Sequence, residues 1–216
     1  MPTYPPIAPS TTTASYLTTI EPNVRFTSIV TVGNALPGGG VFGGIPDGIG
    51  AFDNGNGTIT VIVNHELSAG QGIAHGPLLA GAFIDRLVID QATLGVVGSG
   101  KAVTTLNLWN DATDSYFTGS AAFSRFCSGD LADSTAFFNS STGLGTQVRI
   151  YLTGEESGPE GRASQAKYIF APSSASSVSG CSSEKLTSSI AWKLAVAVLV
   201  SARYSNSSMK VNWPLL

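Results

Sequence analysis

The chain has 216 residues and a mass of 22.2 kDa, enough for one domain with its own core and too many to depend on disulfides. Charged residues make up 12% and glycine contributes 25 residues, which favours a protein rich in strands and turns over a helical bundle. The net charge of −3 and pI near 5.2 exclude an extensive basic surface, so we expect no nucleic-acid partner.

The sequence contains no clear signal for export, for membrane insertion or for a cysteine-based site. The first residues contain neither a basic nor an apolar segment, so we expect no signal peptide in this chain. The most apolar run, residues 190–200, is about half the length of a spanning helix and contains Lys193, so we expect no membrane span. Cys127 and Cys181 lie in unrelated contexts and predict neither a disulfide framework nor a zinc-ligand pair.

A Pro/Thr-rich lead-in covers residues 1–20, and a β-rich domain is expected over 21–171. The strongest strand is 58–64, where Ile59, Val61 and Val63 fall on one face at a period of two. Asn and Gly residues at 53–57 tolerate positive φ, so 48–52 and 58–64 are predicted to form a hairpin.

Further strands are predicted at 82–90, 103–109 and 146–153. Repeated strands and turns with few helix signals favour an all-β fold, such as a sandwich, barrel or propeller.

The composition changes at residues 172–216. Nine of the eighteen residues from 172 to 189 are serine, and the apolar run at 190–200 then predicts a short C-terminal helix. Two interpretations stay open: a linker followed by a helix, or foreign or out-of-frame sequence that replaces the rest of a longer protein.

The first cluster with chemical potential is Asn64-His65-Glu66, at the end of the strongest strand. Side chains at strand ends can converge on a ligand, and all three residue types can bind metals. An exposed polar turn is the alternative explanation.

The second cluster surrounds Glu155 and Glu156, again at a predicted strand end. Adjacent carboxylates repel each other unless solvent or a cation intervenes. A metal site and a solvated acidic loop both explain this pair.

Cys127 is either a thiolate ligand or a small buried apolar residue. No Gly-x-Ser-x-Gly elbow surrounds a serine, which disfavours a Ser-His-Asp hydrolase. No Walker loop is present, and residues 53–57 lack the distal Glu of an EF-hand.

Three segments in this order resemble the secreted alkaline phosphatases of the PhoX type. They are Gly-Ile-Pro-Asp-Gly-Ile-Gly-Ala-Phe at 44–52, Ile-Val-Asn-His-Glu-Leu at 62–67 and Leu-Thr-Gly-Glu-Glu at 152–156. The resemblance covers about residues 24–170 and does not extend into the tail.

The resemblance implies a β-propeller that hydrolyses phosphoesters with iron and calcium ions and is secreted or periplasmic. It implies metal ligands at Glu66, Cys127, Glu155 and Glu156. We also expect a metal ligand at Asp47 and substrate contacts at Asn64, His65 and Arg162. The chain is short for this family, so we expect a partial or propeller-derived sheet domain.

We therefore expect a metal-dependent phosphoester hydrolase, complete or incomplete. Two alternatives stay open: a non-catalytic extracellular β-module that calcium stabilises, and a metal-dependent hydrolase of carboxyl esters or lactones. Open sheet edges would also favour pairing with a second copy of the chain.

Overall fold

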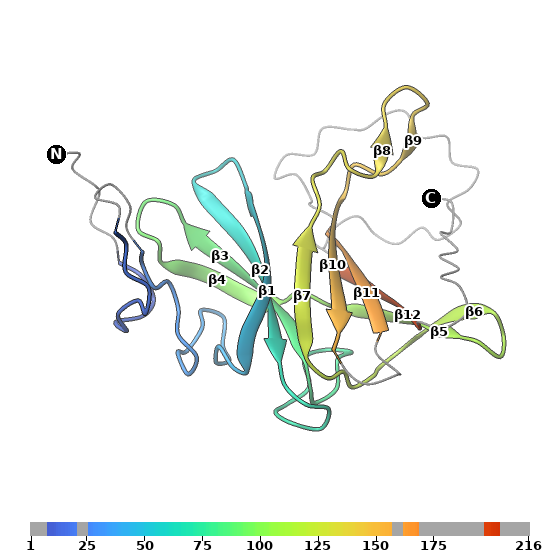
Figure 1. Ribbon diagram of the computed structural model, residues 1–216, viewed down its shortest axis with the longest axis horizontal. Coiled ribbons are helices and arrows are strands. Elements are labelled where there is room, and N and C mark those ends of the chain that lie inside the picture. The colour runs from blue at the N-terminus through green and yellow to red at the C-terminus, as the bar shows by residue number, and fades with distance from the viewer. Residues whose placement is uncertain (1–7, 21–25, 157–161, 169–196, 204–216) are drawn as a thin grey trace.

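The structure is a computed structural model that describes residues 8–20, 26–156, 162–168 and 197–203. Within these residues, all regular elements are β-strands and none is a helix (Figure 1). The strands form sheets of four, six and two strands, and none of these sheets closes on itself. The all-β class is therefore confirmed, whereas a closed propeller is not seen.

The first sheet is an up-and-down antiparallel sheet in chain order. Its strands are β1 (Ile45–Asp53), β2 (Thr58–Glu66), β3 (Phe83–Asp90) and β4 (Val96–Lys101). The predicted hairpin is confirmed as β1 and β2. Gly55 and Gly57 turn the chain between them with φ of +71° and +82°, a region that glycine adopts without steric cost.

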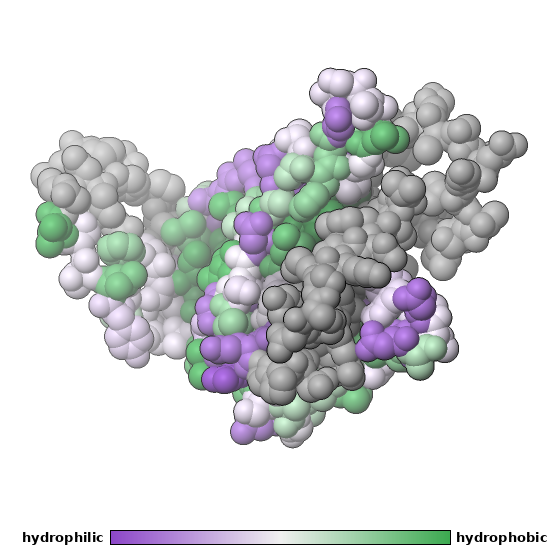
Figure 2. Space-filling model, turned by 45° about the vertical axis from the view of Figure 1, so that its right-hand side comes forward, coloured by the Kyte–Doolittle hydropathy of each residue, from purple (hydrophilic) through white to green (hydrophobic). Residues whose placement is uncertain are grey.

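The second sheet has the order β6-β5-β12-β11-β10-β7. Its strands are β5 (Thr105–Asn110), β6 (Ser115–Gly119), β7 (Phe126–Leu131), β10 (Arg149–Glu155), β11 (Arg162–Tyr168) and β12 (Ala197–Arg203). All neighbours are antiparallel except β12 and β5. The short strands β8 (Phe138–Asn139) and β9 (Leu144–Gly145) form a hairpin that projects at the top of Figure 2 with a mostly polar loop.

The predicted strands at 82–90, 103–109 and 146–153 correspond to β3, β5 and β10. The sequence did not predict β4 or β7, because Gly, Ser and Asp interrupt their apolar pattern. Of the predicted C-terminal helix, 190–196 lie outside the described residues, and 197–200 belong to β12.

Strand β2 is buried on both faces. Ile62 packs in a core between the two sheets with Phe123, Phe126 and other apolar residues. Val63 points to the opposite face and joins a second core with Phe42. The strand therefore lies between two layers of apolar side chains, and its polar residues Asn64 and His65, each 0% exposed, enter the interior.

The two large sheets approach each other closely at Gly48 of β1 and Gly129 of β7. A Cβ on Gly48 would overlap the Gly129 backbone and lie 2.6 Å from the Asn64 Nδ2 atom. Only glycine allows two backbones to approach this closely. This contact places the ends of β2, β7 and β10 side by side (Figure 1).

The described part of the predicted lead-in is only partly exposed. The Ala8 amide donates to the Thr93 carbonyl, and the Val96 amide donates to the Ser10 hydroxyl. By contrast, Tyr16 and Ile20 are each 97% exposed on this N-terminal segment, at the left of Figure 2. Among the described residues, no helix has the length and apolar character needed to span a bilayer.

Candidate metal centre

Glu66, Cys127 and Glu156 converge from three strand ends. Glu66 is the last residue of β2, Cys127 is the second residue of β7, and Glu156 follows β10. Because β7 runs antiparallel to β10, the start of one strand lies beside the end of the other. One ligand atom from each of the three side chains lies within 4.8 Å of the others.

This spacing is about the width of one coordinated ion, whose bonds to nitrogen, oxygen or sulfur are roughly 2.0–2.3 Å. Glu66 and Cys127 are half-buried and Glu156 is exposed, so the group opens to solvent on one side. The three residues are a thiol and two carboxylates. They fit an ion that accepts both sulfur and oxygen ligands, such as iron.

Negative charge is concentrated at this group. Burial raises the pKa of Glu66, and the neighbouring carboxylates Asp47 and Glu156 raise it further. Burial also raises the pKa of the Cys127 thiol, with added contributions from Glu156, Glu66 and Asp47. A cation bound among these groups would favour their charged forms and relieve the repulsion between them.

Asp47, a predicted ligand, lies near enough to the group for its charge to raise the pKa of Glu66. A register shift between Pro46 and Ile49 interrupts the pairing of β1 with β2 at this position. Such irregularities redirect side chains at the ends of sheets. Asp47 is not among the three residues whose ligand atoms converge.

Arg125 is a basic residue at the rim of the group that the sequence did not single out. Its Nη1 atom is 3.7 Å from Glu156 Oε2, and both side chains are more than half exposed. Its backbone has a φ of +43°, which is uncommon for a residue other than glycine. The Arg125 amide donates to Leu67, and the Glu156 amide donates to the Arg125 carbonyl, so the strained residue links the ends of β2 and β10.

Glu155 does not belong to the three-residue group. Its Oε1 atom accepts a 2.7 Å hydrogen bond from the Ser124 amide, so this carboxylate holds the loop that precedes β7. The register shift between Gly154 and Glu155 in the pairing of β10 with β7 accompanies the different placement of the two glutamates. The sequence could not distinguish their roles, because a bulge reverses the alternation of side chains.

Asn64 lies inside the protein, below Glu66 on the same face of β2. Its amide nitrogen donates to the Ser128 carbonyl at 2.8 Å and to the Thr153 hydroxyl at 2.9 Å. Its amide oxygen is 3.1 Å from the Tyr151 hydroxyl. The side chain is therefore fully hydrogen-bonded to β7 and β10, and its atoms do not face solvent.

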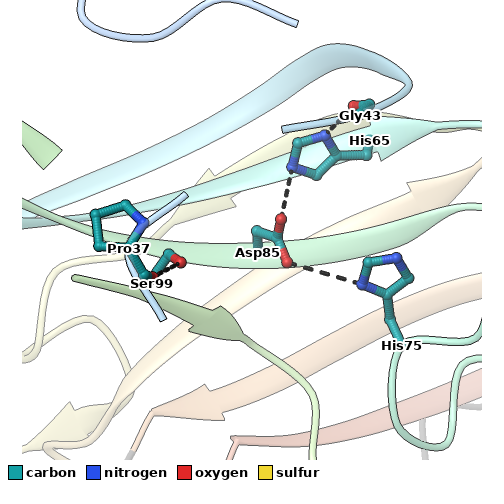
Figure 3. A network of polar contacts seen from close by, with 6 residues as sticks. All are labelled: Pro37, Gly43, His65, His75, Asp85 and Ser99. Carbon is teal, nitrogen blue, oxygen red and sulfur yellow. Dashed lines mark hydrogen bonds and ion pairs between the residues drawn. The ribbon is translucent and has the colours of Figure 1, made fainter. Parts of the chain in front are cut away.

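His65 is also in the interior, on the opposite face of β2. Its Nδ1 atom lies 2.6 Å from the Gly43 carbonyl, which can only accept, so Nδ1 carries the proton (Figure 3). The Nε2 atom is buried without a hydrogen-bond partner and faces Asp85 Oδ2 at 3.5 Å. The His65 ring stacks on the Phe83 ring with 4.3 Å between the ring centroids. The His75 ring also stacks on Phe83, with 3.6 Å between the centroids.

His65 and Asp85 do not form a charged salt bridge at neutral pH, because the His65 ring is then uncharged. Burial lowers the pKa of His65 from 6.5 to about 4 and raises the pKa of Asp85 from 3.8 to about 6. Asp85 Oδ1 also faces His75 Nδ1 at 4.0 Å, so both histidines of the chain lie around this one carboxyl group (Figure 3). This pairing was not predictable from the sequence, since residues 65, 75 and 85 share no motif.

The side chain of Arg162 lies outside the described residues, although its backbone belongs to β11. Its predicted substrate contact stays a prediction.

No family model, curated protein or solved structure matches the chain. The resemblance to PhoX-type phosphatases therefore stays a prediction that rests on the three sequence segments.

Proposed function

We propose that the protein binds a metal ion at Glu66, Cys127 and Glu156 and hydrolyses phosphoesters there. The observation that carries the proposal is the convergence of these three side chains, from separate strand ends, within 4.8 Å. Acidic groups often gather on protein surfaces without binding a metal. Here, however, the group includes a half-buried thiol. Glu66 comes from the first sheet, whereas Cys127 and Glu156 come from the second.

The donor atoms favour a transition-metal ion over calcium at the three-residue group. Calcium is bound by oxygen ligands, whereas a thiolate suits softer ions such as iron. Asp47 and Glu66 supply oxygen atoms beside the thiol, so a neighbouring calcium ion is compatible with the same surface.

Phosphoester hydrolysis requires neutralisation of the phosphoryl oxygens and an activated water molecule, both of which a bound cation supplies. The Arg125 guanidinium lies at the open rim and is positioned to hold a phosphoryl oxygen of the substrate. The carboxylates of Glu66 and Glu156 would hold the cation, and Glu156 also faces the Arg125 guanidinium at 3.7 Å.

The topology supports a propeller-derived domain. The first sheet is a four-stranded up-and-down antiparallel sheet, which is the form of a propeller blade. Its first strand, β1, lies against β7 at the edge of the second sheet, as the innermost strands of adjacent blades do.

A reconstitution experiment tests the proposal. The protein is stripped with a chelator, loaded with Fe²⁺, Ca²⁺ or both, and assayed with a chromogenic phosphomonoester. We expect metal-dependent turnover in the wild type and its loss in Glu66→Gln and Cys127→Ser. Cys181→Ser removes the other cysteine and is the matched control, which should retain activity.

The same assay separates the alternatives. Stabilisation by Ca²⁺ without turnover would replace the proposal with a calcium-stabilised, non-catalytic module, because a ligand that binds only the folded state raises its stability. Faster turnover of a carboxyl ester than of the phosphoester would indicate the third alternative. If no metal binds and no substrate turns over, the proposed function is wrong.

A further inference from the structure

A buried hydrogen-bond network lies directly beneath the candidate metal centre. It consists of the side chains of Asn64, Tyr151 and Thr153 with the carbonyl groups of Gly48 and Ser128. The Asn64 amide uses both hydrogens and its oxygen, and Thr153 Oγ1 donates to the Ser128 carbonyl at 2.7 Å. Asn64 and Tyr151 are 0% exposed and Thr153 is 6% exposed.

Four of the five members of the network are within three residues of a candidate metal ligand or of Asp47. Asn64 is two residues before Glu66, and Thr153 is three residues before Glu156. The Ser128 carbonyl belongs to the residue after Cys127, and the Gly48 carbonyl to the residue after Asp47. Because each strand residue adds only about 3.3 Å, the network and the ligands are a short distance apart along the same strands. A displacement of the network should therefore displace the ligands as well.

The network is important because Glu66 belongs to one sheet and the other two ligands to another. Backbone ladders fix the strand spacing within each sheet, but no ladder joins β2 to β7 or β10. Besides the apolar core between the sheets, two sets of hydrogen bonds tie β2 to the second sheet around the metal centre. One is the hydrogen bond from the Arg125 amide to the Leu67 carbonyl, beyond the ligands, and the other is the network below them.

The Tyr151 hydroxyl keeps its proton throughout the working pH range. Burial raises the pKa of Tyr151, and the charges of Asp47 and Asp130 raise it further. The hydroxyl therefore acts as a donor, 2.9 Å from the Gly48 carbonyl and 3.1 Å from Asn64 Oδ1. It joins β10 to both β1 and β2.

We propose that Asn64, Tyr151 and Thr153 are positioning residues that set the spacing of Glu66, Cys127 and Glu156 and thereby the affinity of the site for a divalent transition-metal ion. This inference rests on the proposed metal site. It assigns to Asn64 a role beneath the metal rather than at the substrate. Partners of this kind, one shell beyond the ligands, typically change metal affinity by about 10- to 100-fold.

The test uses Co²⁺ as the probe, because a cobalt–thiolate bond gives an absorption band that reports on Cys127. Thr153→Val removes the hydroxyl and keeps the shape of the side chain. Thr60→Val is the matched control, since Thr60 is a buried threonine at the other end of β2, 2% exposed, whose hydroxyl donates to Asn54. Denaturant unfolding of both variants shows whether their stability losses are comparable.

We expect Thr153→Val to weaken Co²⁺ binding by about tenfold or more and to alter the absorption band, while Thr60→Val retains wild-type binding. Thr153→Ser, which restores the hydroxyl, should recover most of the affinity. If Thr153→Val does not fold, Tyr151→Phe takes its place, because it removes only the hydroxyl from the network.

Two failures are distinguishable. Equal losses in Thr153→Val and Thr60→Val, or no recovery in Thr153→Ser, would overturn the positioning role and leave the metal site intact. Absence of Co²⁺ binding in the wild type would overturn the proposed metal site, and the positioning role with it.

Discussion

The Tyr151 hydroxyl occupies the space that a side chain on Gly129 would need. A Cβ at Gly129 would overlap this hydroxyl, and it would lie 2.9 Å from the Gly48 carbonyl carbon of the opposite strand. Neither neighbour can move freely, since Tyr151 is fully buried and the Gly48 carbonyl accepts a hydrogen bond from the Tyr151 hydroxyl. The close approach of the two sheets therefore depends on the absence of a side chain at position 129.

Gly129→Ala should accordingly destabilise the protein by roughly 1–3 kcal/mol, the usual cost of overpacking a filled interior. Denaturant unfolding monitored by tryptophan fluorescence measures the change. Gly98→Ala is the control, because a Cβ there meets only Val88 at an ordinary 3.6 Å. Similar stabilities for the two variants would show that the sheets can separate at little cost.

Local sequence patterns predicted the β1–β2 hairpin well. Alternating β-branched residues and an Asn/Gly turn are signals within a short segment, and they predict an antiparallel pair without further information. Strand β7 was missed because Cys127, Ser128 and Gly129 have little intrinsic preference for a strand. Its pairing with β10 is a long-range interaction that a local pattern does not contain.

The position of the candidate site was predictable from the sequence, but the roles of some residues around it were not. Strand ends carrying acidic residues predicted where ligands would gather, and Glu66 and Glu156 lie close together with Cys127. The roles of Asn64 and Arg125 were not predictable, because they depend on the face on which a side chain lies and on contacts between sheets. Asn64 shares a motif with Glu66, yet it is buried in the network below the site.

The two adjacent glutamates should behave differently when the charge of each is removed. Glu156→Gln should weaken Co²⁺ binding by at least about tenfold, because it replaces a candidate ligand. Glu155→Gln should have a much smaller effect, since the amide oxygen can still accept the hydrogen bond from Ser124. Titration of each variant with Co²⁺, followed by absorption, measures both affinities. The opposite ranking would assign the ligand to position 155.

Replacement of Arg125 should impair substrate binding more than protein stability. Arg125→Asn removes the guanidinium at the rim, and asparagine tolerates the positive φ of this position. We expect KM for the phosphomonoester to rise by roughly tenfold, equivalent to about 1.4 kcal/mol of lost binding. Steady-state kinetics and thermal unfolding of the same sample measure the two effects separately.

Arg86→Gln, on β3, is the control for Arg125 and should leave KM unchanged. An unchanged KM in Arg125→Asn would exclude a role of this residue in substrate binding.

The buried pair of His65 and Asp85 makes opposite contributions to the pH dependence of stability. Between about pH 3.8 and 6 the folded state holds a proton on Asp85 that the unfolded state has lost, so this contribution falls as the pH rises. Between about pH 4 and 6.5 the unfolded state holds a proton on His65 that the folded state lacks, so this contribution rises. The two slopes offset each other over most of this range.

Asp85→Asn should unmask the His65 contribution. Each slope is at most about 1.36 kcal/mol per pH unit, so the free energy of unfolding of the variant, relative to wild type, should increase by roughly 2 kcal/mol from about pH 4.5 to 6. Denaturant unfolding at the two pH values, with chelator present, measures this difference. Asp111→Asn, in the exposed turn after β5, should follow the wild-type profile. Parallel profiles for Asp85→Asn and wild type would show that the Asp85 carboxyl group titrates alike in the folded and unfolded states.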